Sequence, residues 1–91
     1  MKVVWTDTAK RNLRTIHDYI AQNSPAYAKR MVDRLTNRSK QIAVFPLSGR
    51  IVPELEVGQI RELLHPPYRI IYHIRLDHVE VIGVLHMSRR I

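Results

Sequence analysis

The stretch from Ile60 to Leu76 reads I-R-E-L-L-H-P-P-Y-R-I-I-Y-H-I-R-L and holds two strand-like runs separated by a His-Pro-Pro break. Side chains of a strand alternate between its two faces, so the second run has one apolar, aromatic face and one face that carries arginines. The apolar face consists of Tyr68, Ile70, Tyr72 and Ile74. This pattern predicts a strand in a sheet that has helices on one face.

The two turns of this region decide which side chains meet. If His65-Pro66-Pro67 is a three-residue loop, Arg61 and Arg69 lie on the same side of the sheet. If Leu76-Asp77 is a two-residue turn, His86 shares that side with Arg69. We therefore expect Arg61, Arg69 and His86 to converge on the face away from the helices.

The first half of the chain predicts a short strand followed by a helical hairpin. Lys2 to Trp5 is a strand-forming run, and Thr6 or Asp7 caps the helix that follows. Ser24-Pro25 begins a second helix, which ends at Phe45-Pro46 because proline disfavours the helical conformation in the residue before it. The expected buried stripes are Ala9, Leu13, Ile16 and Ile20 in the first helix, and Ala28, Met31, Val32, Leu35, Ser39 and Ile42 in the second.

The second half predicts a loop and then three strands. Residues 47–58 read as a loop with a short extended piece at 50–52, and Val79 to Met87 form the last strand. Gly83 marks a bulge or a close approach in that strand. Val81 and Leu85 are expected on the face under the helices.

These elements predict an α+β fold of the order β-α-α-β-β-β, in which residues 1–91 form a single domain. The sheet is expected to be antiparallel, with about four strands and the N-terminal two-helix hairpin packed on one face.

Charge is distributed unevenly along the chain. The formal net charge is +7; residues 1–45 hold nine Lys or Arg against three Asp, and residues 46–91 hold six against five acids. Such an excess favours a polyanionic partner, either nucleic acid or an acidic protein. Arg30, Arg34 and Arg38 form a ridge at helical spacing, which is either a solvated outer face or an electrostatic contact surface.

Several classes of protein are disfavoured by composition. No apolar run approaches the roughly 20 residues that span a bilayer, and no signal peptide is recognisable, so we expect a soluble, cytoplasmic protein without a membrane partner. Cysteine is absent, which excludes disulfides and thiolate metal sites. No metal and no cofactor are expected, because four histidines lack ligand-like grouping. These are His17, His65, His73 and His78.

Four motifs, in this order of elements, carry a resemblance to a known family. They are Gly49-Arg50, Arg61-Glu62-Leu63, Tyr68-Arg69-Ile70-Ile71-Tyr72, and Val84-Leu85-His86 followed by Ser88-Arg89. Over essentially the whole chain the sequence resembles the RelE/ParE toxin superfamily, most closely ParE, a type often labelled a plasmid-stabilisation protein. The opening Trp5-Thr6 and the apolar stripe of the first helix also resemble that family.

For RelE-type members, the resemblance implies cleavage of mRNA on the ribosome. Arg69 matches the first phosphate-binding arginine of that site, and Glu54 is a match for the glutamate base of some members. The sequence also departs from that pattern. Met87 and Ser88 stand where active nucleases commonly place arginine, histidine or tyrosine, and no tyrosine follows Arg89-Arg90. The lysines that RelE uses before the hairpin are missing as well.

These departures fit ParE, whose members resemble the nucleases in fold but trap DNA gyrase on cleaved DNA. We therefore expect the toxin of a type II toxin–antitoxin pair that inhibits gyrase by binding. The first alternative is an mRNA endonuclease, and the second is a basic module that binds only its antitoxin. The expected target-binding residues are Arg61, Arg69, His86, Arg89 and Arg90, and the catalytic candidates of a nuclease are Glu54, Arg61, Arg69 and His86.

Two further expectations follow from the resemblance and the charge. The partner is an acidic, ParD- or RelB-like antitoxin that binds Arg30, Arg34 and Arg38 and forms a hetero-oligomer with the toxin. Arg61 and Arg69 also have a competing structural role, in which they bind Glu62 or loop carbonyl groups to hold the hairpin.

Overall fold

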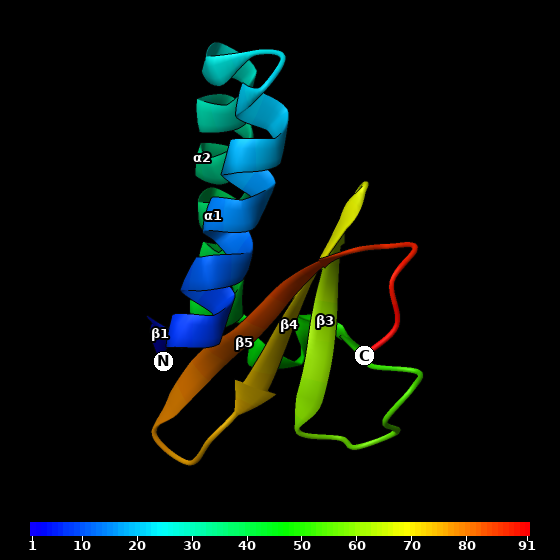
Figure 1. The fold of residues 1–91 in the computed structure, drawn as a ribbon. Helices are drawn as coiled ribbons and strands as arrows, with labels where there is room; N and C mark the ends of the chain where they lie inside the picture. Colours follow the sequence, from blue (N-terminus) through cyan, green and yellow to red (C-terminus); the bar gives the residue numbers. More distant parts are fainter.

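Two antiparallel helices lie against one face of a five-stranded sheet in the computed structural model, which describes residues 1–91 (Figure 1). The elements in chain order are β1 (Lys2–Trp5), α1 (Asp7–Ala21), α2 (Pro25–Val44), the 3-10 turn η1 (Pro46–Ser48), β2 (Arg50–Ile51), β3 (Ile60–His65), β4 (Tyr68–Ile74) and β5 (His78–His86). The predicted α+β order and the N-terminal helical hairpin are confirmed.

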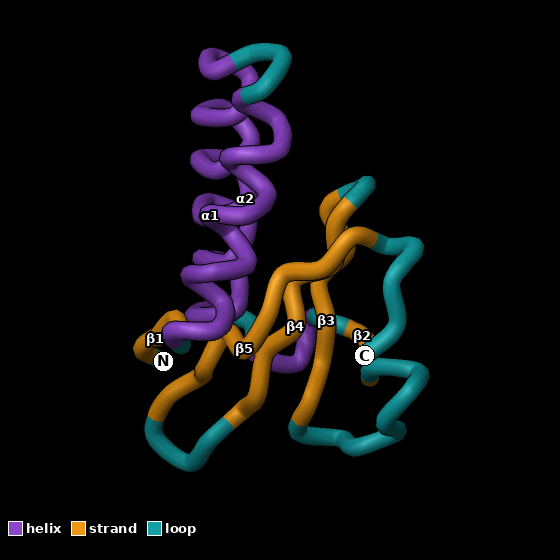
Figure 2. The backbone as a smooth tube through the Cα atoms, in the orientation of Figure 1, coloured by secondary structure: helices purple, strands orange, loops and turns teal.

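The sheet differs from the expected antiparallel arrangement at one edge. Its strand order is β1-β5-β4-β3-β2, and β1 pairs in parallel with β5 while the other neighbours are antiparallel. Val3 and Trp5 of β1 pack against the core when the strand takes this edge position. The sheet is therefore mixed, with β1 and β2 as its two edges (Figure 2).

Both helices begin at the predicted caps. The Thr6 hydroxyl accepts a hydrogen bond from the Ala9 N–H at 3.2 Å, and the Ser24 hydroxyl accepts one from the Tyr27 N–H at 3.1 Å. α2 ends at Val44, directly before Phe45-Pro46. Neither helix is long and apolar enough to cross a membrane.

The core lies where the base of the helical hairpin packs on the sheet, while the far end of the hairpin extends beyond it (Figure 1). Apolar burial of this kind is the main stabilising contribution to such a small fold. The core residues are Ala9, Ile16, Met31, Leu35, Ile42, Leu63, Tyr68, Ile70, Tyr72, Val79, Val81 and Val84. The predicted apolar face of β4 is thereby confirmed, and so are the predicted helical stripes except for Val32, which is only half-buried and lies outside the core.

The β3–β4 hairpin has a shorter loop than expected. His65 pairs with Tyr68, so only Pro66 and Pro67 lie in the loop. A change of one residue in loop length moves every β3 side chain to the other face. Arg61 consequently lies opposite Tyr72, and the expectation that it shares a face with Arg69 is wrong.

A bulge changes the facing of the second half of β5. The turn between β4 and β5 has the expected length, since the Arg75 N–H bonds the His78 carbonyl at 2.9 Å. Ile71 then pairs with Gly83 and Tyr72 with Val81, which leaves Ile82 as an extra residue. The bulge expected near Gly83 is confirmed.

Two facing predictions fail because of this extra residue. Arg69 pairs with Leu85, and Tyr68 pairs with His86. His86 therefore lies on the helix side of the sheet and Leu85 on the Arg69 side, the reverse of what a bulge-free strand predicts.

Candidate functional site

Arg69 forms the centre of a charge network on the sheet face away from the helices. Its Nε donates to Glu62 Oε1 at 2.7 Å, while Nη1 and Nη2 donate to Oε2 and Oε1 of Glu54 at 2.8 and 2.9 Å. Nη1 also donates to the Arg89 carbonyl at 3.1 Å. Only 7% of the Arg69 side chain is exposed. Four of the five N–H groups of this guanidinium thus have protein acceptors.

Glu62 links this arginine to a second one. Its side chain is fully buried, and its other oxygen, Oε2, accepts from Arg50 Nε at 2.5 Å. β2 pairs Arg50 directly with Glu62, so the pairing of the strands brings the two side chains together. Sequence reasoning did not assign Glu62 to the site. The available signal was an acid beside Arg61 in a run whose other residues are apolar, because a carboxylate that is buried requires a cationic partner.

The network holds Glu54 firmly in its ionised form. Hydrogen bonds from Arg69, and then from the Ile91 N–H, lower the pKa of Glu54 from 4.5 to about 2. The same Glu54 contact raises the pKa of Arg69. A general base works best with a pKa near the working pH, so Glu54 in this setting is poorly suited to accept a proton.

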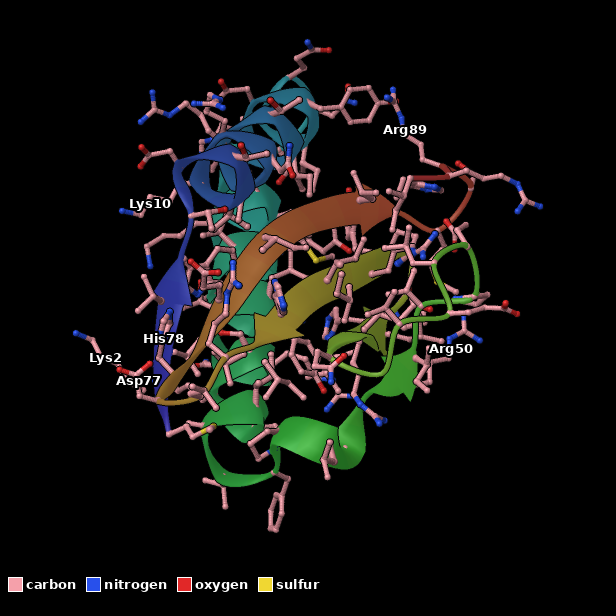
Figure 3. All side chains as sticks on the ribbon, turned by 90° about the horizontal axis from the view of Figure 1, so that it is seen from below. Lys2, Lys10, Arg50, Asp77, His78 and Arg89 are labelled. Atoms are coloured by element: carbon pink, nitrogen blue, oxygen red, sulfur yellow. The ribbon has the colours of Figure 1, made fainter.

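The C-terminal segment folds back onto the same network. Glu54 Oε2 accepts the Ile91 N–H at 3.1 Å, and the Met87 N–H bonds the Pro67 carbonyl at 2.7 Å. Figures 1 and 2 show this segment running from the end of β5 toward β2. The side chains of Arg89 and Arg90 stay exposed, and neither forms an ion pair. Figure 3 shows the Arg89 side chain at the outside of the molecule.

Arg61 has a separate, structural set of partners. Its Nε donates to the Gly58 carbonyl and its Nη1 to the Gly49 carbonyl, each at 3.0 Å. These bonds tie the two ends of the loop that joins β2 and β3. The competing role considered for Arg61 and Arg69, holding loop carbonyls and Glu62 respectively, is the one the structure displays.

Gly49 sits where only glycine fits. The Tyr72 hydroxyl accepts the Gly49 N–H at 3.0 Å and donates to the Pro46 carbonyl at 2.6 Å. A Cβ on Gly49 would lie 2.5 Å from that hydroxyl oxygen and 2.6 Å from the Glu62 carbonyl oxygen. Burial raises the pKa of Tyr72. The Gly49-Arg50 motif is therefore explained by a close backbone approach followed by the ion pair to Glu62.

A groove of about 640 Å³ lies on the other side, between α1 and the end of β5. His86 lines it, with its ring edge-on to Tyr68 at 5.8 Å between centroids. Its Nδ1 accepts the Ser88 N–H at 3.1 Å. Arg89 also lines the groove. The α1 residues that line it, which sequence reasoning missed, are Asn12, Thr15, Ile16 and Tyr19.

The candidate residues thus divide into two groups. Arg69 and Glu54 are bound to each other, whereas His86 faces the opposite side of the sheet. The expected convergence of Arg61, Arg69 and His86 is wrong, for the two register reasons given above. The residues that remain exposed are His86, Arg89 and Arg90.

The basic ridge of α2 is only partly open. Arg30 lies over the Tyr27 ring at 5.7 Å, and Arg34 is exposed without an ion pair. Arg38 is half-buried, bonds the Gln41 side chain, and reaches the Leu64 carbonyl at 3.5 Å. Arg30 and Arg34 are therefore the members of the ridge that are fully presented to a partner.

Comparison with known proteins places this geometry in context. The model of the ParE toxin of the type II toxin–antitoxin system parDE matches residues 3–91. The chain is 38% identical over 89 residues to Toxin RelE2 of Caulobacter vibrioides, covering 97% of each chain.

Solved structures share the fold. A chain of the chromosomal ParDE TA system from P. aeruginosa superposes with a TM-score of 0.79 at 22% identity, covering 94% of this chain and 95% of that one. The YoeB/ParE toxin from Agrobacterium tumefaciens superposes with a TM-score of 0.65 at 16% identity, covering 94% and 98%. By the match over nearly its whole length, this chain belongs to the ParE toxin family of type II toxin–antitoxin systems, within the ParE/RelE superfamily.

Proposed function

We propose that this toxin inhibits DNA gyrase by binding it, traps the enzyme on cleaved DNA, and arrests growth until its antitoxin neutralises it. The observation that carries the proposal is the mutual bonding of Glu54 and Arg69. In a nuclease these two groups would hold the phosphate and accept a proton. Here four of the five N–H donors of the arginine are occupied, and the carboxylate has a pKa of about 2.

The position of His86 also supports binding over catalysis. Proton transfer in phosphodiester cleavage needs acid and base groups within hydrogen-bond reach of one substrate. His86 lies on the helix side of the sheet, while Glu54 and Arg69 lie on the other. No single substrate phosphate is placed to use all three.

Arg89, Arg90 and His86 are the residues we assign to the target contact. Arg89 and His86 line the same groove, and Arg90 is exposed beside Arg89. Arginine is well suited to this role, because its planar fork binds carboxylates or phosphates and it is enriched at protein interfaces.

The antitoxin is proposed to be an acidic segment that binds the helical hairpin. Residues 7–44 carry eight Lys or Arg against three Asp, and Arg30 and Arg34 are the open part of the ridge. The outer edges of β1 and β2 are available for an added strand, because each strand has one neighbour only.

A ribosome-dependent mRNA endonuclease is the second candidate. One observation favours it: a relative that is 38% identical over 89 residues is named Toxin RelE2, and RelE-type members cleave mRNA. In this reading, substrate phosphate would have to displace Glu54 from Arg69 before cleavage.

The two candidates differ in the first process to stop inside a cell. Toxin is induced without antitoxin, and the incorporation of labelled thymidine and of labelled methionine is followed over time. Gyrase trapping predicts that DNA synthesis falls first and that cleaved DNA accumulates covalently bound to gyrase. An early loss of protein synthesis with intact chromosomal DNA would overturn the proposal in favour of mRNA cleavage.

A further inference from the structure

We propose that Glu54 and Arg69 act as positioning residues for the segment Ser88–Ile91, so that Arg89 and Arg90 reach the target from a fixed main chain. This inference rests on the proposed function, since it takes those two arginines to be the target contact. It assigns a positioning role to a pair whose sequence match suggests catalysis.

The geometry shows one ion pair holding the segment at two points. Arg69 Nη1 donates to both Glu54 Oε2 and the Arg89 carbonyl, at 2.8 and 3.1 Å. The same Glu54 oxygen accepts the Ile91 N–H at 3.1 Å. The main chain is therefore fixed on both sides of Arg90, while the Arg89 and Arg90 side chains are left exposed.

The Glu54–Arg69 pair acts as a clamp on the segment, and the side chains beneath it are rigidly held. Arg69 and Glu62 are buried, and Glu62 is held in turn by Arg50. Arg69 lies in β4, between β3 and β5 in the sheet. Because Arg69 is anchored in a central strand, the segment it holds has a fixed position relative to the sheet. The segment is therefore preorganised for binding.

The unpaired positive charge in this region lies on the segment and not on the network beneath it. Arg50 and Arg69 are neutralised by Glu54 and Glu62. Arg89 and Arg90 have no acidic partner among the ion pairs of the chain. An anionic target therefore meets two unpaired guanidinium groups next to an internally balanced network.

Two variants remove the clamp by different routes. Glu54→Gln removes the negative charge of the carboxylate, whose oxygens accept hydrogen bonds from Arg69 and from the Ile91 N–H. Ile91→Pro removes the N–H donor, because proline has none, and also restricts the backbone of Arg90, but it leaves the hydrogen bonds between Glu54 and Arg69 in place. The matched controls are Glu56→Gln, at an exposed glutamate of the same loop whose side chain forms no hydrogen bond, and Ile91→Ala, which keeps the N–H.

Three properties are measured on each variant. ¹⁵N relaxation reports the order of the Arg89 and Arg90 amides, urea unfolding reports the fold, and growth arrest is titrated as the toxin level per cell that halves the growth rate. The last readout needs no assumption about the target. The order of the segment is measured without any target present. The result on positioning therefore remains valid even if gyrase proves not to be the target.

We expect Glu54→Gln and Ile91→Pro to make both amides mobile on the ps–ns scale and to raise the arresting dose about tenfold, or roughly 1.4 kcal/mol. Both controls should match the natural chain. Ile91→Pro should leave the unfolding midpoint unchanged, which separates positioning from a loss of fold. A segment that stays ordered in both variants, or one that becomes mobile with no change in dose, would overturn the inference.

Discussion

Glu54 and Arg69 face each other through two parallel hydrogen bonds, 2.8 Å from Nη1 to Oε2 and 2.9 Å from Nη2 to Oε1. Such charge-assisted, bidentate pairs are stronger than hydrogen bonds between neutral groups. The pair lies next to the buried Glu62, which shares Arg69. A pair of residues that would serve chemistry in a nuclease is here part of the scaffold that holds the C-terminal segment.

Acid should weaken this scaffold in a defined pH range. The pKa of Glu54 is lowered from 4.5 to about 2 in the fold, so its contribution to stability is complete above pH 4.5. It is lost as the pH falls through 2, where the folded state also takes up the proton. Urea unfolding of the natural chain and of Glu54→Gln should show a stability difference that is constant above about pH 5 and shrinks below pH 4.5.

Glu56→Gln is the control for this pH series. The Glu56 side chain is exposed and has no hydrogen bond or ion pair, so its replacement should not remove the pH dependence that the Glu54–Arg69 pair contributes. A Glu54→Gln variant with the same pH dependence as the natural chain would show that the ion pair to Arg69 contributes nothing to the fold.

The fold was largely predictable because its signals are local. The hydroxyl caps at Thr6 and Ser24, the helical stripes and the alternation through Tyr68, Ile70 and Tyr72 each specify an element directly. The parallel pairing of β1 with β5 was not predictable in this way. It joins strands at the two ends of the chain, and nothing in a short apolar run specifies its partner.

The site was less predictable because it depends on two single-residue shifts. The Pro66-Pro67 loop and the extra residue Ile82 each reverse the facing of a strand segment. Arg69 was correctly placed on the face away from the helices, but its partners, Glu54 and Glu62, come from elements whose register the sequence leaves open. Glu54 and Arg69 were recognised as candidates, whereas the membership of Glu62 and the grouping of the three were not predicted.

The hydroxyl of Tyr72 should stabilise the loop before β2. Tyr72→Phe leaves the Gly49 N–H without its acceptor and the Pro46 carbonyl without its donor, in a buried setting. The free energy of unfolding should fall by about 1–3 kcal/mol, which chemical denaturation measures. Tyr19→Phe is the control, since Tyr19 is 70% exposed and its hydroxyl has no partner, and it should change stability by less than about 0.5 kcal/mol. Equal effects of the two changes would contradict a role for the Tyr72 hydroxyl.

Charge on α2 should govern the rate at which the antitoxin associates. Reversing Arg30 and Arg34 to glutamate should slow association by roughly tenfold or more and change dissociation less, and raised salt should have the same effect on the natural chain. Stopped-flow or surface-binding kinetics measure both rates. Arg89→Glu with Arg90→Glu changes net charge equally at two exposed residues outside the helical hairpin and the β1 edge; Figure 3 shows Arg89 on the opposite side of the molecule from Lys2. If this control slows association as much, the attraction is a property of net charge and not of the ridge.

His86 distinguishes binding from catalysis. His86→Gln keeps a group that accepts the Ser88 N–H but removes titration. Because glutamine keeps a hydrogen-bonding side chain at this position of the proposed target contact, a binding mechanism predicts only a small rise in the growth-arresting dose. An mRNA nuclease that uses His86 as acid or base predicts a loss of roughly 10²- to 10⁴-fold in cleavage rate. The toxin dose for growth arrest, titrated for both proteins, decides between them.

The most direct measurement uses purified toxin with gyrase and supercoiled plasmid, run beside translating ribosomes that carry a defined mRNA. Our proposal predicts that the natural chain accumulates gyrase-linked cleaved plasmid and leaves the mRNA intact. Arg89→Ala combined with Arg90→Ala should lose this effect while still binding antitoxin. Cleavage of the mRNA in the ribosomal A site, with gyrase unaffected, would contradict it.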